Sequence, residues 1–589
     1  MKKNTAKVLG IFLLVAMTAN YFVGTPVKAQ TVTSGGTLIL SQYFDIDSLN
    51  PFTMAADPAF RVTEKIYETL FTVLNNGTYY PDLATSWSIS PDAMTYTFNL
   101  QHGVTWQDGQ PFTSQDVKYT FELAMSNSAL SNDQLAVSEL KGVDAPDNYT
   151  VVFHLNSPLV PFLMYGGYDV KIVPKHIWVN VSDPAKYIND NPIGTGPFMF
   201  VSRTPGQQIV LKAYDNYWGG RPHVDGLIFK VYTNADARVL ALLKGEIDGA
   251  GSIPSTSIGS LIGQPNVTVI KTPGTNVNNW LGYNLRVYPF NIRQVRQAID
   301  YAVDKNFIYN QIEMGIAMHG SDGDITPAMT QWADPNAPLW KGNGFSADQR
   351  IAAGNALLDE LGFKLGPDGV RATPNGTRLE FELLAPTSPS DYVRAGEAVA
   401  NDLAKIGMKI DVKPLETDTV INIVYPSAGI PNYQMYIMGS GYDPDPDAVL
   451  YLEFFSNPPV PSWTADSEHY RNDTLNALLL QERQEPNIAK RQALIYQIQE
   501  LLADDLPYIP LFHRVGIAAY RTDKFIGWNE EGIYSQFTAL NLHLITTTTP
   551  TAQVITETPS WVWALSTVAL LAVIVSVGYA LNLRRKSKT

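Results

Sequence analysis

The chain of 589 residues contains no cysteine. This absence excludes disulfides, thiolate zinc sites, iron–sulfur clusters, a cysteine nucleophile and an N-terminal lipid-modified cysteine. Charged residues are also few, at 17% of the sequence, whereas hydrophobic residues make up 45%. That balance is typical of a globular protein with large cores and not of a disordered chain. The length predicts roughly four structural units, or two large lobes.

Basic residues are scarce between the two ends of the chain. Eight of the 42 Lys and Arg residues lie at the ends, which leaves 34 against 56 Asp and Glu residues, a net charge of −22. An acidic body without a basic patch is a poor electrostatic partner for phosphates. We therefore expect no nucleic-acid partner.

Recognisable catalytic motifs are absent as well. The sequence contains no G-x-S-x-G elbow, no glycine-rich loop ending in Gly-Lys-Ser/Thr and no H-E-x-x-H. The eight histidines are spread singly, and none lies at metal-ligand spacing from another. We therefore expect no enzymatic activity, no cofactor and no metal site.

The first 29 residues predict a secretory signal. Three lysines precede an apolar run over residues 8–23, and Val27 and Ala29 supply the small residues of a cleavage site before Gln30. The alternative is an uncleaved membrane anchor, for which the apolar run is short.

The C-terminal end predicts a single membrane span over residues 561–583. This stretch carries no formal charge, has aromatic residues near its edges and is followed by a basic tail at 584–589. At ~1.5 Å per residue it can cross a hydrocarbon core of ~30 Å, and basic residues stay on the cytoplasmic side. Residues 546–560, rich in Thr and Pro, suit an extended stalk. We therefore expect a cell-membrane protein whose bulk is extracellular and whose C-terminus is cytoplasmic.

Strand and helix patterns alternate through the body, which predicts an α/β protein. Strands are predicted over residues 37–42, 94–100, 151–155, 171–173, 209–213, 227–232, 379–384, 409–413 and 433–438, and residues 247–250 end the unit that begins at 208. Helices are predicted over residues 58–71, 113–124, 235–243, 293–312, 346–361, 392–406 and 487–503, the second opened by a capping box of Thr113 and Asp116. Strand-like residues 509–520 could return the chain to the first lobe. Two α/β lobes joined by more than one crossing predict a hinged ligand trap.

The most unusual local feature is the sequence Asp-Pro-Asp-Pro-Asp at residues 443–447. A calcium loop would need further oxygen ligands and a glycine, and neither follows. One interpretation is a rigid turn whose aspartates cap a helix beginning at Ala448. The other is that Asp443 presents a carboxylate to a positive group or to hydroxyls of a ligand. Both can hold, because three aspartates are available.

Several segments occur in an order and spacing typical of one family, and they resemble the family 5 extracellular solute-binding proteins of ABC importers, the dipeptide- and oligopeptide-binding proteins. The resemblance runs over residues 35–544. It is carried by GGTL at 35–38, DSLNP at 47–51, IYETL at 66–70, PDLATSW at 81–87, the tract 96–116 with GVTW and DG, GTGPF at 194–198, YW at 217–218, LKGEID at 243–248, VRQAI at 295–299 with DK at 304–305, and 443–447.

The resemblance implies a two-lobed periplasmic-binding-protein-like fold, type II, of the three-domain oligopeptide-binding class. Lobe I would be discontinuous and comprise residues 30–70, 190–270 and 511–545. An inserted domain would take residues 71–189, and lobe II would take residues 271–510.

In peptide-binding members the ligand backbone adds as a strand between the lobes, and an aspartate pairs with its α-ammonium. The matching positions are Ser41, Gln42 and Tyr43 in the first lobe, Gly439, Ser440 and Gly441 in the second, and Asp443 as the ammonium partner. Relatives usually carry Trp where this chain has Ser440. Loss of that ring could enlarge the pocket or let water enter it.

The same family includes oligosaccharide binders and some nickel binders, so the ligand class stays open. Trp280, Tyr283, Tyr442 and Trp463 could offer flat faces to sugar rings. Archaeal sugar binders of the family resemble this chain in their Thr-rich stalk and C-terminal helix, which suggests an archaeal membrane-anchored form.

The family implies a monomeric receptor that hands a peptide or oligosaccharide to a permease with cytoplasmic ATPases. A different class of function is a surface hydrolase that uses Asp443, Asp445 or Asp447 with Glu453. A third is a sensory or adhesive surface protein that has lost transport.

Overall fold

The computed structural model describes residues 31–33, 35–73, 79–130, 132, 134–272, 278–426, 430–441, 445–456, 467–528 and 546–549. The chain forms two compact units, 1–33 with 548–589 and 34–547. The predicted signal, the span 561–583 and its basic tail lie outside the described residues. Within the described part of the chain, no helix has both the length and the apolar character needed to cross a membrane.

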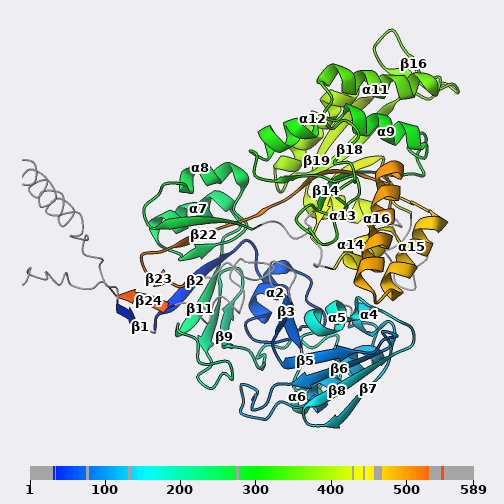
Figure 1. Cartoon of the computed structure of the whole chain (residues 1–589). Coiled ribbons are helices and arrows are strands. Elements are labelled where there is room, and N and C mark those ends of the chain that lie inside the picture. Colours follow the sequence, from blue (N-terminus) through cyan, green and yellow to red (C-terminus); the bar gives the residue numbers. More distant parts are fainter. Residues whose placement is uncertain are drawn as a thin grey trace, which may run out of the picture. The chain divides into compact units, whose positions relative to one another are not determined.

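The first large sheet of residues 34–547 has seven strands in the order β13-β22-β12-β2-β11-β10-β9 (Figure 1). Strand β2 pairs in parallel with β11 and β12, and the other pairs are antiparallel. The strands are β2 (Thr37–Gln42), β9 (Phe198–Thr204), β10 (Gln208–Ala213), β11 (Gly226–Val231), β12 (Gly249–Ala250), β13 (Val267–Thr272) and β22 (Gly516–Arg521). The accompanying helices are α2 (Asp57–Thr63), α7 (Ala235–Lys244), η4 (Ser255–Ser257) and α8 (Ile258–Leu261), and β23 (Phe525–Ile526) pairs with β24 (Thr546–Thr549).

A four-stranded antiparallel sheet in the order β5-β6-β8-β7 has its own aromatic core. Thr113 and Asp116 form the predicted capping box at the start of α3, which confirms that prediction. The strand predicted over 171–173 is wrong, because these residues form no strand pairing. The elements are β3 (Phe71–Val73), β4 (Tyr79–Pro81), β5 (Ala84–Ile89), β6 (Thr95–Leu100), β7 (Leu140–Asp147), β8 (Thr150–Leu155), α3 (Ser114–Ser126), α4 (Gln134–Val137), α5 (Phe162–Met164), η3 (Tyr165–Asp169) and α6 (Lys175–Trp178).

The second large sheet has six strands in the order β15-β21-β14-β20-β18-β19. They are β14 (Asn278–Tyr283), β15 (Met318–His319), β18 (Glu380–Pro386), β19 (Lys409–Leu415), β20 (Met435–Ser440) and β21 (Ile509–His513). One hydrophobic core involves α9 (Arg293–Ala302), α11 (Ala347–Glu360) and α12 (Asp391–Ala404). Another involves α13 (Thr417–Val424), α14 (Asp447–Phe454), α15 (Asp473–Gln484) and α16 (Ile488–Asp505). Smaller elements are α10 (Lys305–Phe307), η5 (Ile308–Ile312), β16 (Lys364–Leu365) and β17 (Arg371–Ala372).

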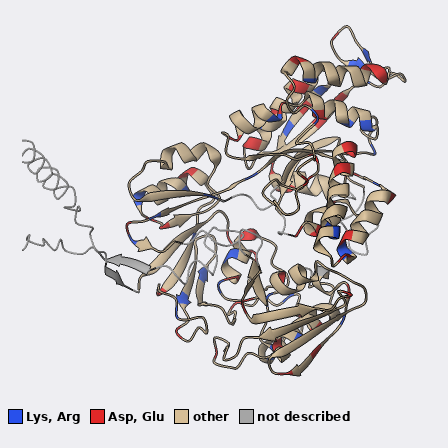
Figure 2. Ribbon diagram, in the orientation of Figure 1, with Lys and Arg blue, Asp and Glu red and all other residues tan. Residues whose placement is uncertain are grey.

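Neighbouring residues of β14 and β20 contribute to different cores, so both faces of this sheet are covered. Trp280 and Tyr436 belong to one hydrophobic core, whereas Leu281 and Ile437 belong to the other. Burial on both faces is the usual state of a sheet with helical crossovers. Figure 2 shows acidic and basic residues interspersed on α9, α11 and α12. This sheet and the helices that cover it confirm the mixed α/β class predicted from the sequence.

Two predicted helices are shorter than expected. The helix predicted over 58–71 ends at Thr63, because the carbonyls of Lys65 and Ile66 accept hydrogen bonds from the amides of Phe198 and Gly196. These long-range bonds compete with continuation of the helix.

The helix predicted over 293–312 is interrupted after Ala302. Val303 is extended, and the side chain of Asp304 accepts the amide of Phe307 at 3.0 Å to begin α10. An aspartate that bonds the backbone in this way favours a new helix start.

The chain passes between the two large sheets twice, from β13 to β14 and from β21 to β22. The sequence from His513 to Gly516 makes the second passage in a few residues. Few crossings leave a rotation between two rigid sheets sterically possible, which is the usual basis of hinge motion.

Candidate functional site

The predicted second-lobe residues lie at the carboxyl end of β20. Gly439 and Ser440 are the last two residues of this strand, both half-buried, and Gly441 follows, exposed. In the antiparallel partner β14, Asn279 is opposite Gly439 and Asn278 is opposite Ser440. Gly439 and Ser440 are therefore paired with two asparagines of β14, while the backbone at 439–441 stays accessible enough to contact a ligand.

The environment of Gly439 excludes a side chain. A Cβ placed there would lie 2.3 Å from Asn279 Oδ1 and 2.7 Å from the Tyr392 hydroxyl. The same hydroxyl donates to Asn279 Oδ1 at 2.8 Å, and Asn279 Nδ2 donates to the carbonyl of Phe512 at 3.3 Å. This buried network fixes the end of β20, so only glycine fits at position 439.

Asn278 is held in place by Asp324. Its Nδ2 donates to the Asp324 carboxyl group, and both residues are buried. Desolvation raises the pKa of Asp324 to about 7. Asn278, Asn279, Asp324 and Tyr392 were not predicted from the sequence. The one pattern that could have indicated them is the Asn-Asn pair that opens an otherwise apolar strand.

Tyr442, Asp443 and Trp463 lie outside the described residues. The structure therefore describes the predicted ligand-contacting residues 439–441 but not the predicted ammonium partner.

The predicted first-lobe residues lie at the carboxyl end of β2. Gln42 is buried and donates through Nε2 to the carbonyl of Pro58 at 3.1 Å. The Tyr43 hydroxyl donates to Asp57 Oδ2 at 2.7 Å, and Arg61 Nε donates to the same oxygen at 2.6 Å. The strand end is thus tied to the first turn of α2.

Two features of this strand end suit a polar ligand. The hydroxyl oxygen of Ser41 is buried without a hydrogen-bond partner among the described residues, and such groups usually meet a ligand or water. Desolvation, with the Asp57 carboxylate next in importance, raises the pKa of Tyr43, so its hydroxyl stays protonated, donates to Asp57 and can accept a hydrogen bond from a ligand.

Trp280 and Tyr283 occupy core positions, which corrects the expectation that they offer open faces to sugar rings. Trp280 stacks on Tyr508 with ring centroids 5.0 Å apart and donates to the Tyr436 hydroxyl at 3.0 Å. Tyr283 donates to the carbonyl of Leu506 at 2.7 Å. The physical reason is that every residue of β14, a strand paired on both edges, is buried.

The aspartates at 445 and 447 are used inside the fold. Asp445 accepts two hydrogen bonds from Arg491, at 2.8 and 2.5 Å, and a third from the amide of Asp447 at 2.9 Å. Asp447 lies 2.9 Å from Arg483 Nε and accepts the hydroxyl of Tyr165 at 2.6 Å. The prediction that the aspartates cap a helix beginning at Ala448 is wrong, because α14 begins at Asp447 and its N-cap residue, Pro446, makes no side-chain cap hydrogen bond.

The same contacts remove the basis of the hydrolase hypothesis for two of its residues. A hydrolytic carboxylate must reach the substrate or its water, yet Asp445 and Asp447 are buried in ion pairs. Glu453 is also buried, and desolvation together with the carboxylates of Glu468 and Asp324 raises its pKa well above the usual range. Among the described residues, no three potential ligands are grouped to hold a metal ion.

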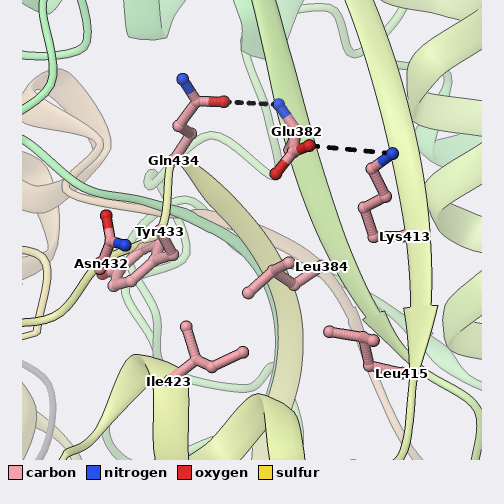
Figure 3. Close-up of a pocket in the computed structure, with 8 residues that line it drawn as sticks. All are labelled: Glu382, Leu384, Lys413, Leu415, Ile423, Asn432, Tyr433 and Gln434. Atoms are coloured by element: carbon pink, nitrogen blue, oxygen red, sulfur yellow. Dashed lines mark hydrogen bonds and ion pairs between the residues drawn. The ribbon is translucent and has the colours of Figure 1, made fainter.

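A separate cavity of about 680 Å³ lies between β18, β19, α13 and residues 432–434 (Figure 3). Gln434 accepts the amide of Glu382 at 2.7 Å, and Lys413 Nζ lies 3.8 Å from Glu382 Oε1. The aliphatic wall consists of Leu384, Leu415 and Ile423. None of the predicted ligand residues lines this cavity.

Comparison with known proteins identifies relatives over most of the chain. The model of the bacterial extracellular solute-binding proteins, family 5, middle part, matches residues 78–460. A protein of Brucella ovis named as an ABC transporter peptide-binding protein is 29% identical over 457 residues, 76% of this chain and 81% of the relative. The heme-binding protein A of Haemophilus influenzae is 27% identical over 486 residues, 77% of this chain and 83% of the relative.

Solved structures share the fold. The oligopeptide-binding protein AppA of Bacillus subtilis, in complex with a nonapeptide, has a TM-score of 0.72 at 22% identity and covers 87% of this chain and 99% of its own. A periplasmic oligopeptide-binding protein of Thermotoga maritima with bound mannohexaose has a TM-score of 0.72 at 21% identity, covering 87% and 98%.

Proposed function

Because the chain belongs to family 5 of the bacterial extracellular solute-binding proteins, we propose that it is the receptor of an ABC importer that captures di- and oligopeptides. The ligand would be enclosed between two hinged lobes and passed unchanged to a permease driven by cytoplasmic ATPases. The observation that carries this proposal is the family match over residues 78–460, on a fold with two large sheets joined by two crossings. The peptide ligand is supported by the name of the Brucella relative.

The three sheets support a three-domain organisation. Lobe I would comprise residues 30–70, 190–270 and 511–545, around the seven-stranded sheet. The inserted domain, 71–189, would correspond to the four-stranded sheet, and lobe II, 271–510, to most of the six-stranded sheet. The boundary between residues 510 and 511 falls inside β21, which pairs in the six-stranded sheet, so the hinge would follow His513.

The ligand site is proposed at the carboxyl ends of β2 and β20. Both strands have a parallel neighbour, and open α/β sheets bind ligands at the carboxyl ends of such strands. Ser41, Gln42 and Tyr43 would contact the ligand from lobe I, and residues 439–441 would bond its backbone from lobe II. Asp443 would pair with the α-ammonium.

An oligosaccharide is the second candidate ligand. It is favoured by the mannohexaose-bound Thermotoga structure and by Ser440 at a position where relatives usually carry a ring. Of the aromatic residues that could stack on sugars, Tyr442 and Trp463 remain in this hypothesis. A related structure with bound Ni(L-His) makes nickel a third ligand to screen.

The receptor would stay attached to the cell by the span at 561–583 after export and cleavage at Ala29, as a monomer of the membrane-anchored form found in archaea. Residues 546–549 form β24 and pair with β23, which corrects the predicted start of the stalk, so protease applied to intact cells should release the body by cutting within residues 550–560. Retention of the whole chain inside the cells would contradict this topology.

Calorimetry on wild type and Asp443→Ala tests both the function and the ligand class. A peptide should lose about 2 to 5 kcal/mol of binding free energy, because its ammonium would stay buried and unpaired. An oligosaccharide should lose about 1 kcal/mol, one hydrogen bond. Asp348→Ala, at an exposed position on α11, is the control and should leave both affinities unchanged. If peptides, oligosaccharides and Ni²⁺ all leave the melting temperature of the wild type unchanged, the receptor function is refuted.

A further inference from the structure

Two hydrogen bonds join residues 79–189 to residues 278–513, and Ala448 of α14 belongs to the hydrophobic core around the four-stranded sheet. The Tyr165 hydroxyl donates to Asp447 Oδ2 at 2.6 Å, and the amide of Val160 donates to the carbonyl of Arg483 at 2.7 Å. Tyr165 and Val160 follow the four-stranded sheet in sequence, whereas Asp447 and Arg483 belong to α14 and α15 beside the six-stranded sheet. Elements far apart in the sequence are thus joined directly.

The Tyr165 contact is buried and lies beside an ion pair. Tyr165 is 1% exposed and Asp447 is 0% exposed. Arg483 Nε lies 2.9 Å from the other oxygen of Asp447, and its guanidinium lies 3.6 Å from the centroid of the Tyr451 ring. Desolvation, followed by the Asp447 carboxylate, raises the pKa of Tyr165, so the hydroxyl remains a donor. A bond from a hydroxyl to a buried carboxylate is among the stronger hydrogen bonds in proteins.

Asp447 is itself held rigidly on the side of the six-stranded sheet. Its amide donates to Asp445 Oδ1, and Asp445 is fixed by Arg491, which also donates to Glu482 Oε2 at 2.9 Å. Pro446 lies between the two aspartates and restricts the backbone. The acceptor of the Tyr165 hydroxyl therefore cannot follow Tyr165 if the two parts separate.

The part of the chain that contains Tyr165 is instead attached to the seven-stranded sheet. Within the same body as Tyr165, Gln107 donates through Nε2 to the carbonyls of Gly196 at 3.0 Å and Phe198 at 2.9 Å, and Phe198 begins β9. A rotation of the two large sheets about their crossings would carry Tyr165 with one sheet and Asp447 with the other. The two lobes therefore cannot rotate apart unless the Tyr165 contact breaks.

We propose that Tyr165, Asp447 and Arg483 form a closing latch that sets the equilibrium between the open and closed lobes. The inference rests on the proposed receptor function, since it assumes that the lobes move. Ligand affinity scales with the population of the binding-competent state, so the latch tunes the affinity for every ligand by the same factor. The aspartate motif at 443–447 thereby acquires a conformational role in addition to any contact with ligand.

Tyr165→Phe removes the hydroxyl and keeps the ring. The matched control is Tyr96→Phe, because Tyr96 is equally buried and its hydroxyl donates to the carbonyl of Leu159 at 2.8 Å, a hydrogen bond that stays within residues 79–189. Since the chain has no cysteine, spin labels can be attached at Ser126→Cys on α3 and Glu500→Cys on α16, both exposed. Electron–electron resonance then gives the distance distribution between the labels in the full-length protein.

Without ligand, Tyr165→Phe should raise the ratio of long to short distances about tenfold or more, as expected for loss of a hydrogen bond to a carboxylate. Tyr96→Phe should leave the distribution of the wild type unchanged, and a ligand found by thermal screening should restore the short distance in Tyr165→Phe. Identical distributions in wild type and Tyr165→Phe would overturn the latch, as would equal shifts in both variants. These distances are measured without ligand, so they stay distinguishable from a failure of the receptor function, which is detected by the thermal screen alone.

Discussion

Replacing Glu468 by Gln should flatten the dependence of protein stability on pH. Glu468 is 2% exposed, accepts the hydroxyl of Tyr436 on one oxygen and accepts the hydroxyl of Ser467 on the other at 2.7 Å. Desolvation raises its pKa to about 8, and Arg286 is near enough to lower that pKa by a smaller amount. The carboxyl group is therefore buried in its neutral form at neutral pH.

The sign of the effect follows from the raised pKa in the folded state. The stabilising contribution of a neutral Glu468 is fully present below the unfolded pKa of about 4.3 and is lost as the pH rises through about 8. A shift of one pKa unit corresponds to about 1.4 kcal/mol, so this residue alone accounts for a loss on the order of 4 kcal/mol between pH 5 and pH 9. Glu468→Gln removes that loss. At pH 5 the variant should be less stable by about 1 kcal/mol, because the amide satisfies Tyr436 and Ser467 less well.

Thermal unfolding measured from pH 5 to pH 9 shows whether the stability curves of the variant and the wild type cross. The melting temperature of Glu468→Gln should lie slightly below that of the wild type at pH 5 and several degrees above it at pH 9. Glu397→Gln, at an exposed position on α12, controls for the loss of one negative charge and should follow the wild type. A difference between Glu468→Gln and wild type that stays constant over this range would refute the assignment of Glu468 as a buried neutral acid.

Two further substitutions test the geometry of the fold. Gly439→Ala should cost about 1 to 3 kcal/mol of stability, because its Cβ would lie 2.7 Å from the Tyr392 hydroxyl; Gly142→Ala, where no atom lies within 4 Å, is the control, and equal melting temperatures for the two variants would contradict the crowding. Arg491→Met should cost about 3 to 5 kcal/mol, since it leaves the Asp445 carboxylate buried and unpaired. Adding Asp445→Asn should recover part of that loss in chemical denaturation, and no recovery would argue against a direct pair.

Local patterns were sufficient where the decisive contacts are local. The strand predicted over 37–42 has the bounds of β2, because apolar residues alternate along it and one edge pairs with the equally regular β11. The capping box of Thr113 and Asp116 was also readable, since both partners lie within four residues. The early end of α2 was not readable, because the hydrogen bonds that compete with its continuation come from residues 196 and 198.

The site was less accessible to sequence reasoning than the fold. Aromatic rings suit sugars, which favours Trp280 and Tyr283 as ligand surfaces, but their strand has neighbours on both edges and cores on both faces. That burial depends on the position of β14 within the sheet, which no local pattern encodes. The constraint on Gly439 is similarly set by Asn279 and by Tyr392, the latter 47 residues away in the sequence.

The aspartate motif shows why residue type alone cannot separate structural from binding roles. Asp445 and Asp447 each have a buried arginine partner, so their replacement should lower stability before it affects binding. Asp443 remains the candidate of this motif for a ligand's positive group. If the motif divides in this way, Asp443→Ala should lower the affinity at an unchanged melting temperature of the free protein, whereas Asp445→Ala should lower the melting temperature. A fall in melting temperature for Asp443→Ala, with the affinity for peptides retained, would assign all three aspartates to the fold and leave the ligand's ammonium to another residue.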